Sequence, residues 1–232
     1  MSTTVGPDVQ PTLAERYAAL AGEAYAPRPV DAVLRGLDVV LATSVLFVAA
    51  PLLVVLMAAL RLTSGRPVLY RGPRVGRFGE LFVMYKLRTL KPDAESRLGP
   101  YLGPELTRRT EAEVTRLGRV LRATQLDELP QLVNVLRGEM SIVGPRPIRP
   151  TFFEELCTDI PQYWQRLVVR PGLTGFAQVR MTREMTWAEK LAHDLEYLAD
   201  RSVGLYLRLV VATAWRITGR TWDEVRTLVE RP

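Results

Sequence analysis

Two adjacent carboxylates, Asp127 and Glu128, are the residues of this sequence best placed for chemistry. They lie in the segment TQLDELPQL, where a helix is expected to begin, and Pro130 suits an early helical position. Unpaired backbone N–H groups at a helix N-terminus favour ionised carboxylates, which can attack an electrophile or bind a cation. The alternative is structural, because Thr124 and Asp127 have the spacing of a capping box that only starts the helix.

Basic residues are expected around the same helix. Arginine presents a planar fork to a phosphate group and lysine presents a point charge, so this cluster predicts phosphate binding. The alternative is a solvated basic surface, but Lys86 and Arg146 adjoin apolar strands and rigid prolines rather than long polar segments. The cluster consists of Lys86, Arg88, Arg119, Arg122, Arg146 and Arg149.

Other common catalytic groups are scarce. The chain has one cysteine, Cys157, and one histidine, His193, which excludes an intrachain disulfide and a Cys/His zinc site. Any Ser-His-Asp mechanism would have to use His193. The chemistry is therefore expected to depend on carboxylates, arginine and lysine.

A further carboxylate, Asp194, falls at the edge of the apolar stripe of an expected helix, close to Tyr197. A carboxylate in that position needs a partner, and one of the arginines is the expected one. His193 points to the polar side of the same helix and is interpreted as a surface histidine. The stripe consists of Trp187, Leu191, Leu195 and Leu198.

The overall composition is that of a globular protein with a phosphate-rich partner. The chain has 232 residues, of which 47% are hydrophobic and 24% charged, and this excludes a disordered or collagen-like chain. The net charge of +6 suits nucleic acid, anionic lipid or a nucleotide. Residues 1–30 are polar and Pro-rich and are expected to form an exposed lead-in with one short helix at 12–21. No secretory signal fits them.

The longest apolar run, residues 36–60, contains a single charge, Asp38. As a helix it would measure ~37 Å, against a bilayer hydrocarbon core of roughly 30 Å. The alternative is a buried core helix, but a run that is apolar on every face favours the membrane. Pro51 predicts a break or kink inside it. Arginines flank it on both sides, which favours a re-entrant segment over 31–64, although a tilted single span stays open.

The remainder, residues 65–232, is expected to be an α+β, mostly helical catalytic domain with a small strand element and surface amphipathic helices. Short strands are expected at 67–70, 81–86 and 140–144, and a long loop around a short helix, interpreted as an active-site lid, at 91–113. Helices are expected at 126–137, 151–168, 187–198 and 205–217, the last lying on a surface rather than crossing one.

Several of these blocks together resemble the bacterial sugar transferase family, the monotopic phosphoglycosyl transferases, in its small form with the catalytic domain alone. The resemblance runs from about Asp31 to Trp215, and its longest block is LGRVLRATQLDELPQLVNVLRGEMSIVGPRP at 117–147. The other blocks, in family order, are the apolar run with its proline, RVG at 74–76, YKLRTL at 85–90, RPGLTGFAQV at 170–179 and the Trp187–Tyr197 helix.

The resemblance implies transfer of a phosphosugar from a UDP-sugar to a polyprenyl (undecaprenyl) phosphate, with release of UMP and a requirement for Mg²⁺. Asp127 matches the family's nucleophile, which forms a covalent phosphosugar intermediate, and Glu128 matches the second member, which helps hold the metal or manages the acceptor. Lys86, Arg122 and Arg146 match its conserved basic positions. The turn of Pro145, Arg146 and Pro147 resembles its nucleotide-side element.

Some positions depart from the family pattern. Gln125 stands where Ser is common, and Ala50 precedes Pro51 where Ser is frequent. Glu113 replaces an arginine, and the segment 180–182 replaces Asn-Gly-Arg. The last two departures leave the identity of the donor sugar open.

The resemblance also implies a bacterial inner (cytoplasmic) membrane protein whose catalytic domain faces the cytoplasm and begins polysaccharide or glycoconjugate assembly. Its expected partners are the donor, the acceptor, membrane lipid and a second copy in a homodimer. One rival is a non-enzymatic membrane-anchored scaffold whose basic face binds anionic lipid. A second rival, a soluble nucleic-acid binder, does not explain residues 36–60 and lacks aromatic residues between its basic ones, so no nucleic-acid partner is expected.

Overall fold

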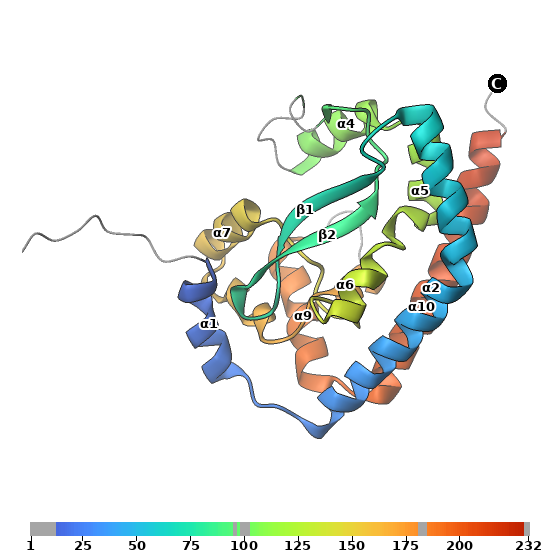
Figure 1. Cartoon of the computed structure of the whole chain (residues 1–232). Helices are drawn as coiled ribbons and strands as arrows, with labels where there is room; N and C mark the ends of the chain where they lie inside the picture. The colour runs from blue at the N-terminus through green and yellow to red at the C-terminus, as the bar shows by residue number, and fades with distance from the viewer. Residues whose placement is uncertain (1–12, 95–96, 98–102, 181–184, 230–232) are drawn as a thin grey trace, which may run out of the picture.

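The computed structural model describes residues 13–94, 97, 103–180 and 185–229 (Figure 1). It confirms the α+β, mostly helical class. The helices are α1 Leu13–Ala24, α2 Pro29–Ser64, α4 Gly103–Glu113, α5 Arg116–Thr124, α6 Gln131–Arg137, α7 Pro150–Asp159, α8 Phe176–Arg180, α9 Trp187–Asp200 and α10 Val203–Val229. Short 3₁₀ helices are η1 Arg77–Gly79, η2 Leu126–Glu128 and η3 Pro161–Val168.

Four short strands form two small sheets. Strands β1 (Leu69–Val75) and β2 (Leu81–Leu87) make an antiparallel hairpin, in which Leu69 pairs with Leu87 and Val75 with Leu81. Strands β3 (Ser141–Val143) and β4 (Gly172–Thr174) pair in parallel. The hairpin lies across the middle of the molecule, with the helices arranged around it (Figure 1). It presents the end of β2 to the loop between α5 and α6.

Helix α2 covers the expected membrane segment, and of the break or kink predicted at Pro51 the break is wrong. The helix continues through Pro51 for 36 residues and follows a gentle arc along one side of the molecule (Figure 1). A helix can absorb the hydrogen bond that a proline removes by bending rather than breaking. It is long and apolar enough to cross a membrane, and only 6% of its most apolar 18-residue stretch is buried.

One face of α2 nevertheless packs on the domain at both ends. Leu34, Asp38 and Ala42 are buried near its start, and Leu60 is buried near its end. The opposite face exposes a row of large apolar side chains, among them Val40, Phe47, Val48, Val54, Val55 and Leu62. The helix is therefore neither buried in the core nor detached from the domain.

Asp38, the one charge of the apolar run, docks α2 onto the domain. Its Oδ1 accepts hydrogen bonds from the Ser141 hydroxyl at 2.9 Å, the Ile142 amide at 2.8 Å and the Tyr206 hydroxyl at 2.9 Å. One turn earlier, Arg35 donates to the carbonyl of Val135 at 2.7 Å, at the C-terminus of α6 where a cation is favoured. The first half of α2 is thus fixed to α6, β3 and α10.

Residues 1–30 were predicted to form an exposed lead-in, and for α1 this prediction is wrong. Residues 1–12 lie outside the described part of the chain. Helix α1 buries Tyr17 and Ala21, which lie four residues apart on one face, in the main core cluster. Because two apolar residues make only a short stripe, this packing was hard to predict from the sequence.

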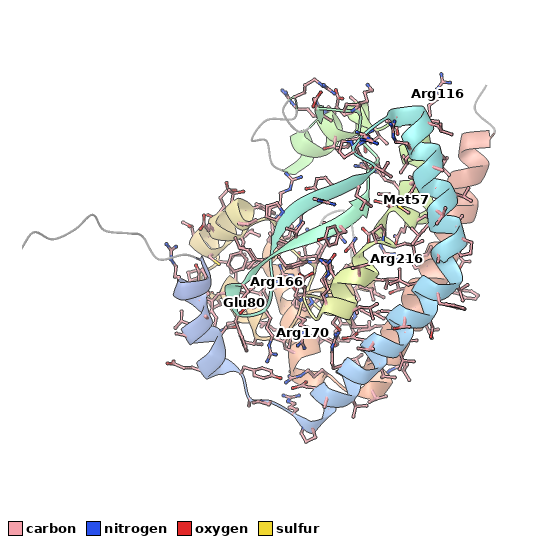
Figure 2. All side chains as sticks on the ribbon, in the orientation of Figure 1. Met57, Glu80, Arg116, Arg166, Arg170 and Arg216 are labelled. Carbon is pink, nitrogen blue, oxygen red and sulfur yellow. The ribbon has the colours of Figure 1, made fainter. Side chains whose placement is uncertain are left out.

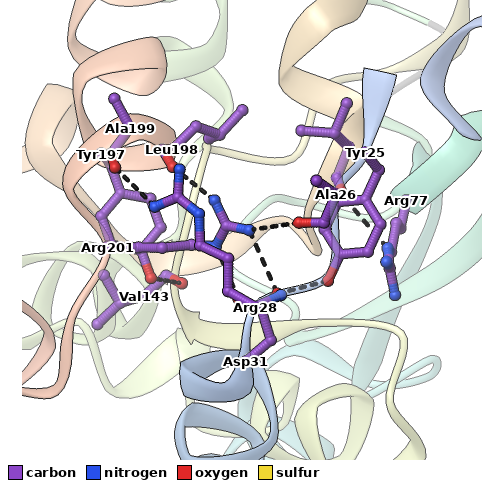
Figure 3. Close-up of polar contacts among 11 residues, drawn as sticks. Tyr25, Ala26, Arg28, Asp31, Arg77, Val143, Tyr197, Leu198, Ala199 and Arg201 are labelled. Atoms are coloured by element: carbon purple, nitrogen blue, oxygen red, sulfur yellow. Dashed lines mark hydrogen bonds and ion pairs between the residues drawn. The ribbon is translucent and has the colours of Figure 1, made fainter. Parts of the chain in front are cut away.

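The link between α1 and α2 is held by a polar network (Figure 3). Arg201, at the junction of α9 and α10, donates to Asp31 at 2.7 Å, and the Tyr25 hydroxyl donates to the same carboxylate at 2.6 Å. The Arg77 guanidinium lies 4.3 Å from the centre of the Tyr25 ring. These contacts fix the start of α2 to the junction of α9 and α10.

Candidate active site

The described residues enclose an open cleft of about 1340 Å³ beside the β1–β2 hairpin. Helix α2 contributes Met57 to its wall and α10 contributes Arg216 (Figure 2). The cleft exceeds the roughly 300–1,000 Å³ typical of a site for one small ligand. The predicted site residues that line it are Lys86, Arg88, Arg122, Asp127, Glu128, Arg146 and Arg149, with further cations Arg71, Arg74 and Lys91.

The two carboxylates are presented by a short 3₁₀ turn rather than by the first turn of a helix. Helix α5 ends where Gln125 adopts a left-handed conformation with φ of 55°, and η2 then carries Asp127 and Glu128 before α6 begins. The capping-box alternative is wrong, because the Thr124 hydroxyl donates back to the Val120 carbonyl of α5 at 2.8 Å. The dyad is therefore not used to start a helix.

The two carboxylates differ in environment. Glu128 accepts a hydrogen bond from Lys86 at 2.5 Å, and Arg146 lies 3.9 Å from the same oxygen. Burial opposes ionisation of Glu128, but these two cations outweigh it and lower its pKa. Asp127 is only 7% exposed, and its burial, assisted by the charge of Glu128, raises its pKa to about 6 against the opposing charges of Lys86 and Arg122.

Arg122 flanks Asp127 on the side of α5. Its Nε donates to the Thr89 hydroxyl at 2.9 Å, just beyond the end of β2. Helix α5 can approach that strand end because Gly118 has no side chain: a Cβ there would lie 2.1 Å from the Thr89 carbonyl oxygen. The glycine in LGRVLR thus allows Arg122 and the dyad to share one cleft.

Arg88 lines the cleft and also contacts the backbone at the end of α2, so its phosphate binding stays a prediction. Its guanidinium donates to the carbonyls of Arg66 at 2.8 Å, Gly65 at 3.2 Å and Ser64, at the C-terminus of α2. A cation there satisfies carbonyls that a helix end leaves unpaired. Nothing in the sequence shows that the end of β2 meets the end of α2.

The loop of residues 144–149 points the Arg146 side chain into the cleft, where 57% of it is exposed. Its backbone is fixed from behind: Arg166 donates to the Arg146 carbonyl at 2.8 Å, and the Gly172 amide donates to the Pro145 carbonyl at 2.9 Å. Pro145 is buried and Pro147 half-buried, and neither lines the cleft. The two prolines shape this loop, and nucleotide binding by them stays a prediction.

The predicted partner of Asp194 is confirmed as Arg166, whose guanidinium lies 2.8 Å from the carboxylate, and both side chains are buried. The same guanidinium holds the Arg146 backbone, so this pair positions the loop from outside the cleft. Tyr197 donates to the Val143 carbonyl at 3.2 Å and does not line the cleft. His193 faces the polar side as predicted, 3.2 Å from Glu196.

Asn134 is a positioning residue that the sequence analysis did not single out. It is fully buried, and its amide pairs with the backbone of β2, donating to the Val83 carbonyl at 2.7 Å and accepting from the Tyr85 amide at 3.1 Å. It thereby fixes α6 against the strand that carries Lys86. The available signal was a polar residue between two valines, Val133 and Val135.

Asp127 and Glu128 suit Mg²⁺ only together with oxygen atoms of a bound substrate. Within the described ranges no group of three or more His, Cys, Asp and Glu side chains could hold a metal ion. Mg²⁺ is commonly held by one or two carboxylates together with water and substrate phosphate oxygens, and Asp127 and Glu128 supply the two carboxylates in a cation-rich cleft. The residues present therefore fit a magnesium ion that arrives with a phosphate group.

Comparison with known proteins gives several matches over the same region. The chain is 41% identical over 191 residues to the UDP-glucose:undecaprenyl-phosphate glucose-1-phosphate transferase of Caulobacter vibrioides, covering 79% of this chain and 69% of that protein. It is 34% identical to the UDP-N-acetylgalactosamine-undecaprenyl-phosphate N-acetylgalactosaminephosphotransferase of Aeromonas hydrophila, covering 81% of this chain but only 44% of that protein.

A third relative, the exopolysaccharide production protein PSS of Rhizobium leguminosarum bv. phaseoli, is 36% identical over 79% of this chain and 94% of its own length. The shared part is thus nearly the whole of one relative and less than half of another. The family model described as bacterial sugar transferase matches residues 30–220, which include α2, the cleft and α10 as far as Arg220. The chain belongs to the bacterial sugar transferase family.

Proposed function

We propose that this chain transfers a sugar phosphate from a UDP-sugar to undecaprenyl phosphate and releases UMP. The observation that carries the proposal is a buried carboxylate, Asp127, in a cleft lined by lysine and arginine side chains. Such a cleft suits the diphosphate of a nucleoside diphosphate sugar and the phosphate of an acceptor. The names of the Caulobacter and Aeromonas relatives give the same donor and acceptor classes with different sugars.

The proposed chemistry has two displacements at phosphorus. Asp127 attacks the β-phosphorus of the donor, the bond from that phosphorus to the bridging oxygen breaks, and UMP leaves. A phosphate oxygen of the acceptor then attacks the same phosphorus, and the Asp127 carboxylate is released. Arg122, Arg146 and Lys86 stabilise the negative charge that develops on the phosphoryl oxygens.

Magnesium, held by Asp127 or Glu128 together with substrate phosphates, would supply further charge neutralisation. Glu128 is kept ionised by Lys86 and Arg146, so it is suited to this task or to orienting the acceptor. Asp127 is buried and Glu128 is half-buried, so water is more completely excluded from Asp127. A poorly solvated carboxylate is the better nucleophile of the two.

The ionisation of Asp127 predicts an acidic limb in the rate of UMP release near pH 6, because only the carboxylate attacks. Lys86→Met removes a charge that lowers the Asp127 pKa, so the limb should move to higher pH. Glu128→Gln removes a charge that raises it, so the limb should move to lower pH. Single-turnover UMP release without acceptor, measured from pH 5 to 8, checks both. Shifts in the same direction would contradict the proposed electrostatics.

We also propose that α2 enters the membrane without crossing it. Both ends of α2 pack on one domain, so a spanning helix would have to separate contacts that the structure holds together. The exposed face of α10 supports attachment to the same surface: Leu207, Val211 and Trp215 form one stripe, and Trp215 is 81% exposed. The expected location is the cytoplasmic side of the bacterial inner membrane.

Single cysteines at the exposed positions Leu20 and Glu80, in a Cys157→Ser background, test this topology. They lie before and after α2, and both should react with an impermeant thiol reagent from the cytoplasmic side only. Inverted membrane vesicles provide the matched control. Reaction of the two sites from opposite sides would show an ordinary membrane span.

The transferase proposal itself is tested with detergent-purified protein, undecaprenyl phosphate and a panel of UDP-sugars. UMP release that depends on the donor sugar, with formation of the lipid-linked sugar, is the expected result. The rival scaffold, which would bind anionic lipid with the same basic face, predicts no UMP release from any donor.

A further inference from the structure

We infer that Arg74, Arg146 and Arg149 form one anion site that holds in succession the phosphate of departing UMP and the phosphate of the incoming acceptor. The inference rests on the proposed function and extends it to a site that both displacements use. All three arginines line the cleft. Arg146 and Arg149 are exposed and Arg74 is half-buried, so a ligand in the cleft can reach each of them.

The backbone brings Arg74 and Arg149 side by side. Val75, at the end of β1, and Ile148 form an isolated antiparallel bridge, in which the Val75 amide donates to the Ile148 carbonyl at 2.9 Å. Arg74 precedes Val75 and Arg149 follows Ile148, so the two arginines are neighbours across the bridge. Val75 and Ile148 are buried, and side chains alternate along extended backbone. The two arginines therefore lie on the opposite side, toward the cleft.

Arg146 completes the cluster and connects it to the dyad, since its guanidinium lies 3.9 Å from the Glu128 carboxylate. Burial lowers the pKa of Arg74, and the charges of Arg149 and Arg146 lower it further, against the opposing effect of Tyr70. Like charges that face each other across paired strands are destabilising. An anion bound between the three guanidinium groups would offset this repulsion.

The chemistry of the cluster selects phosphate monoesters. Guanidinium groups bind phosphate oxygens through paired, charge-assisted hydrogen bonds. UMP and undecaprenyl phosphate are both phosphate monoesters, although one carries a nucleoside and the other a long lipid. A site that recognises the phosphate alone can take either of them. This leaves Arg122, whose charge acts on Asp127, for the phosphoryl group that is transferred.

The order of the two displacements requires both phosphates to use the same place. In phosphoryl transfer the attacking and leaving oxygens lie roughly in line on opposite sides of phosphorus. In the first displacement Asp127 attacks, and the bridging oxygen leaves with UMP on the far side. In the second, the bond from Asp127 to phosphorus breaks, so the acceptor oxygen must approach from the side that UMP vacated. The two phosphates therefore exclude each other.

The test measures binding of UMP to the detergent-purified wild type by isothermal titration calorimetry, without a donor, so that no transfer takes place. Undecaprenyl phosphate should raise the apparent Kd of UMP in proportion to its own concentration, whereas undecaprenol, which lacks the phosphate, should not. Arg74→Gln and Arg149→Gln should each weaken UMP and undecaprenyl phosphate by the same factor, about 10- to 100-fold, the scale of a hydrogen bond to a charged group.

Two further variants control for charge and folding. Arg116→Gln removes the same charge from an exposed position at the outer edge of the molecule, away from the cleft, and should change both affinities less than about twofold (Figure 2). Arg74→Lys should recover part of the loss, because a point charge replaces a planar fork. Arg149→Gln, at an exposed position, carries the test if Arg74→Gln does not fold. Uridine, without a phosphate, should bind equally to all variants.

Weakening of UMP alone would assign the cluster to the nucleotide, and weakening of undecaprenyl phosphate alone would assign it to the acceptor. Either result would overturn the shared site, as would binding of both ligands without competition. Unchanged affinities in Arg74→Gln and Arg149→Gln would show that the cluster holds neither phosphate. Competition in a wild type that releases no UMP from any UDP-sugar would instead overturn the proposed function.

Discussion

Replacing Asp127 by Asn is expected to reduce turnover by on the order of 10⁴-fold or more, the scale seen when a covalent nucleophile is removed. The substitution keeps the shape of a side chain that is only 7% exposed and removes the charge that attacks phosphorus. Since burial already disfavours that charge, the neutral amide should not destabilise the fold. UMP release is measured together with far-UV circular dichroism and membrane association, both of which should match the wild type.

The same experiment locates the nucleophile when acceptor is left out. Wild-type protein incubated with UDP-sugar and Mg²⁺ should release UMP and carry a phosphosugar adduct on the peptide that contains Asp127. Glu128→Gln should slow this step without removing the adduct, because neighbouring residues in a 3₁₀ turn point about 120° apart and only one can lie in line with the breaking bond. An adduct on Glu128, or UMP release only with acceptor present, would replace the two-step mechanism.

The largest effect on stability is expected from the buried pair of Arg166 and Asp194. Asp194→Ala leaves a guanidinium buried without its partner, which costs about 3–5 kcal/mol in comparable pairs. The midpoint of thermal unfolding should fall by about 10 °C on the scale expected for a chain of this size. Because Arg166 also holds the Arg146 carbonyl, activity should decline in the fraction that stays folded.

Glu196→Ala on the same helix is the matched control, since its pairs with Arg180 and His193 are solvent-exposed and should contribute little. A double variant, Asp194→Leu with Arg166→Met, removes both charges and should recover part of the lost stability. Equal losses in Asp194→Ala and Glu196→Ala would show that the buried pair has no special role.

The chemical centre was predictable because its residues lie in one nearly continuous block. Asp127, Glu128, Arg122 and Arg146 fall within residues 117–147, and the structure brings all four to one cleft, together with Lys86 from β2. The prediction was wrong about the local backbone structure around the dyad. Regular spacing from Leu126 to Leu136 predicted one helix, whereas the dyad lies in a separate 3₁₀ turn that follows the left-handed Gln125 and precedes α6.

What the sequence could not show depends on partners that are distant along the chain. Arg88 meets carbonyls more than 20 residues earlier, and Asp38 meets Ser141 and Tyr206 more than 100 residues later. A basic residue at the end of a strand suits phosphate binding and helix capping equally well until the neighbouring element is known. The pairing of Arg74 with Arg149 is hidden for the same reason, since it depends on the bridge between Val75 and Ile148.

The docking of α2 makes the proposed membrane segment part of the enzyme and not a tether. Leu60 packs with Leu87 at the end of β2 and Leu121 of α5, and Met57 lines the cleft itself. A soluble truncation that begins after Ser64 would therefore lose one wall of the cleft along with its anchor. Exchanging α2 for an unrelated membrane helix would restore attachment but not this wall, so membrane binding and catalysis should separate in such a chimaera.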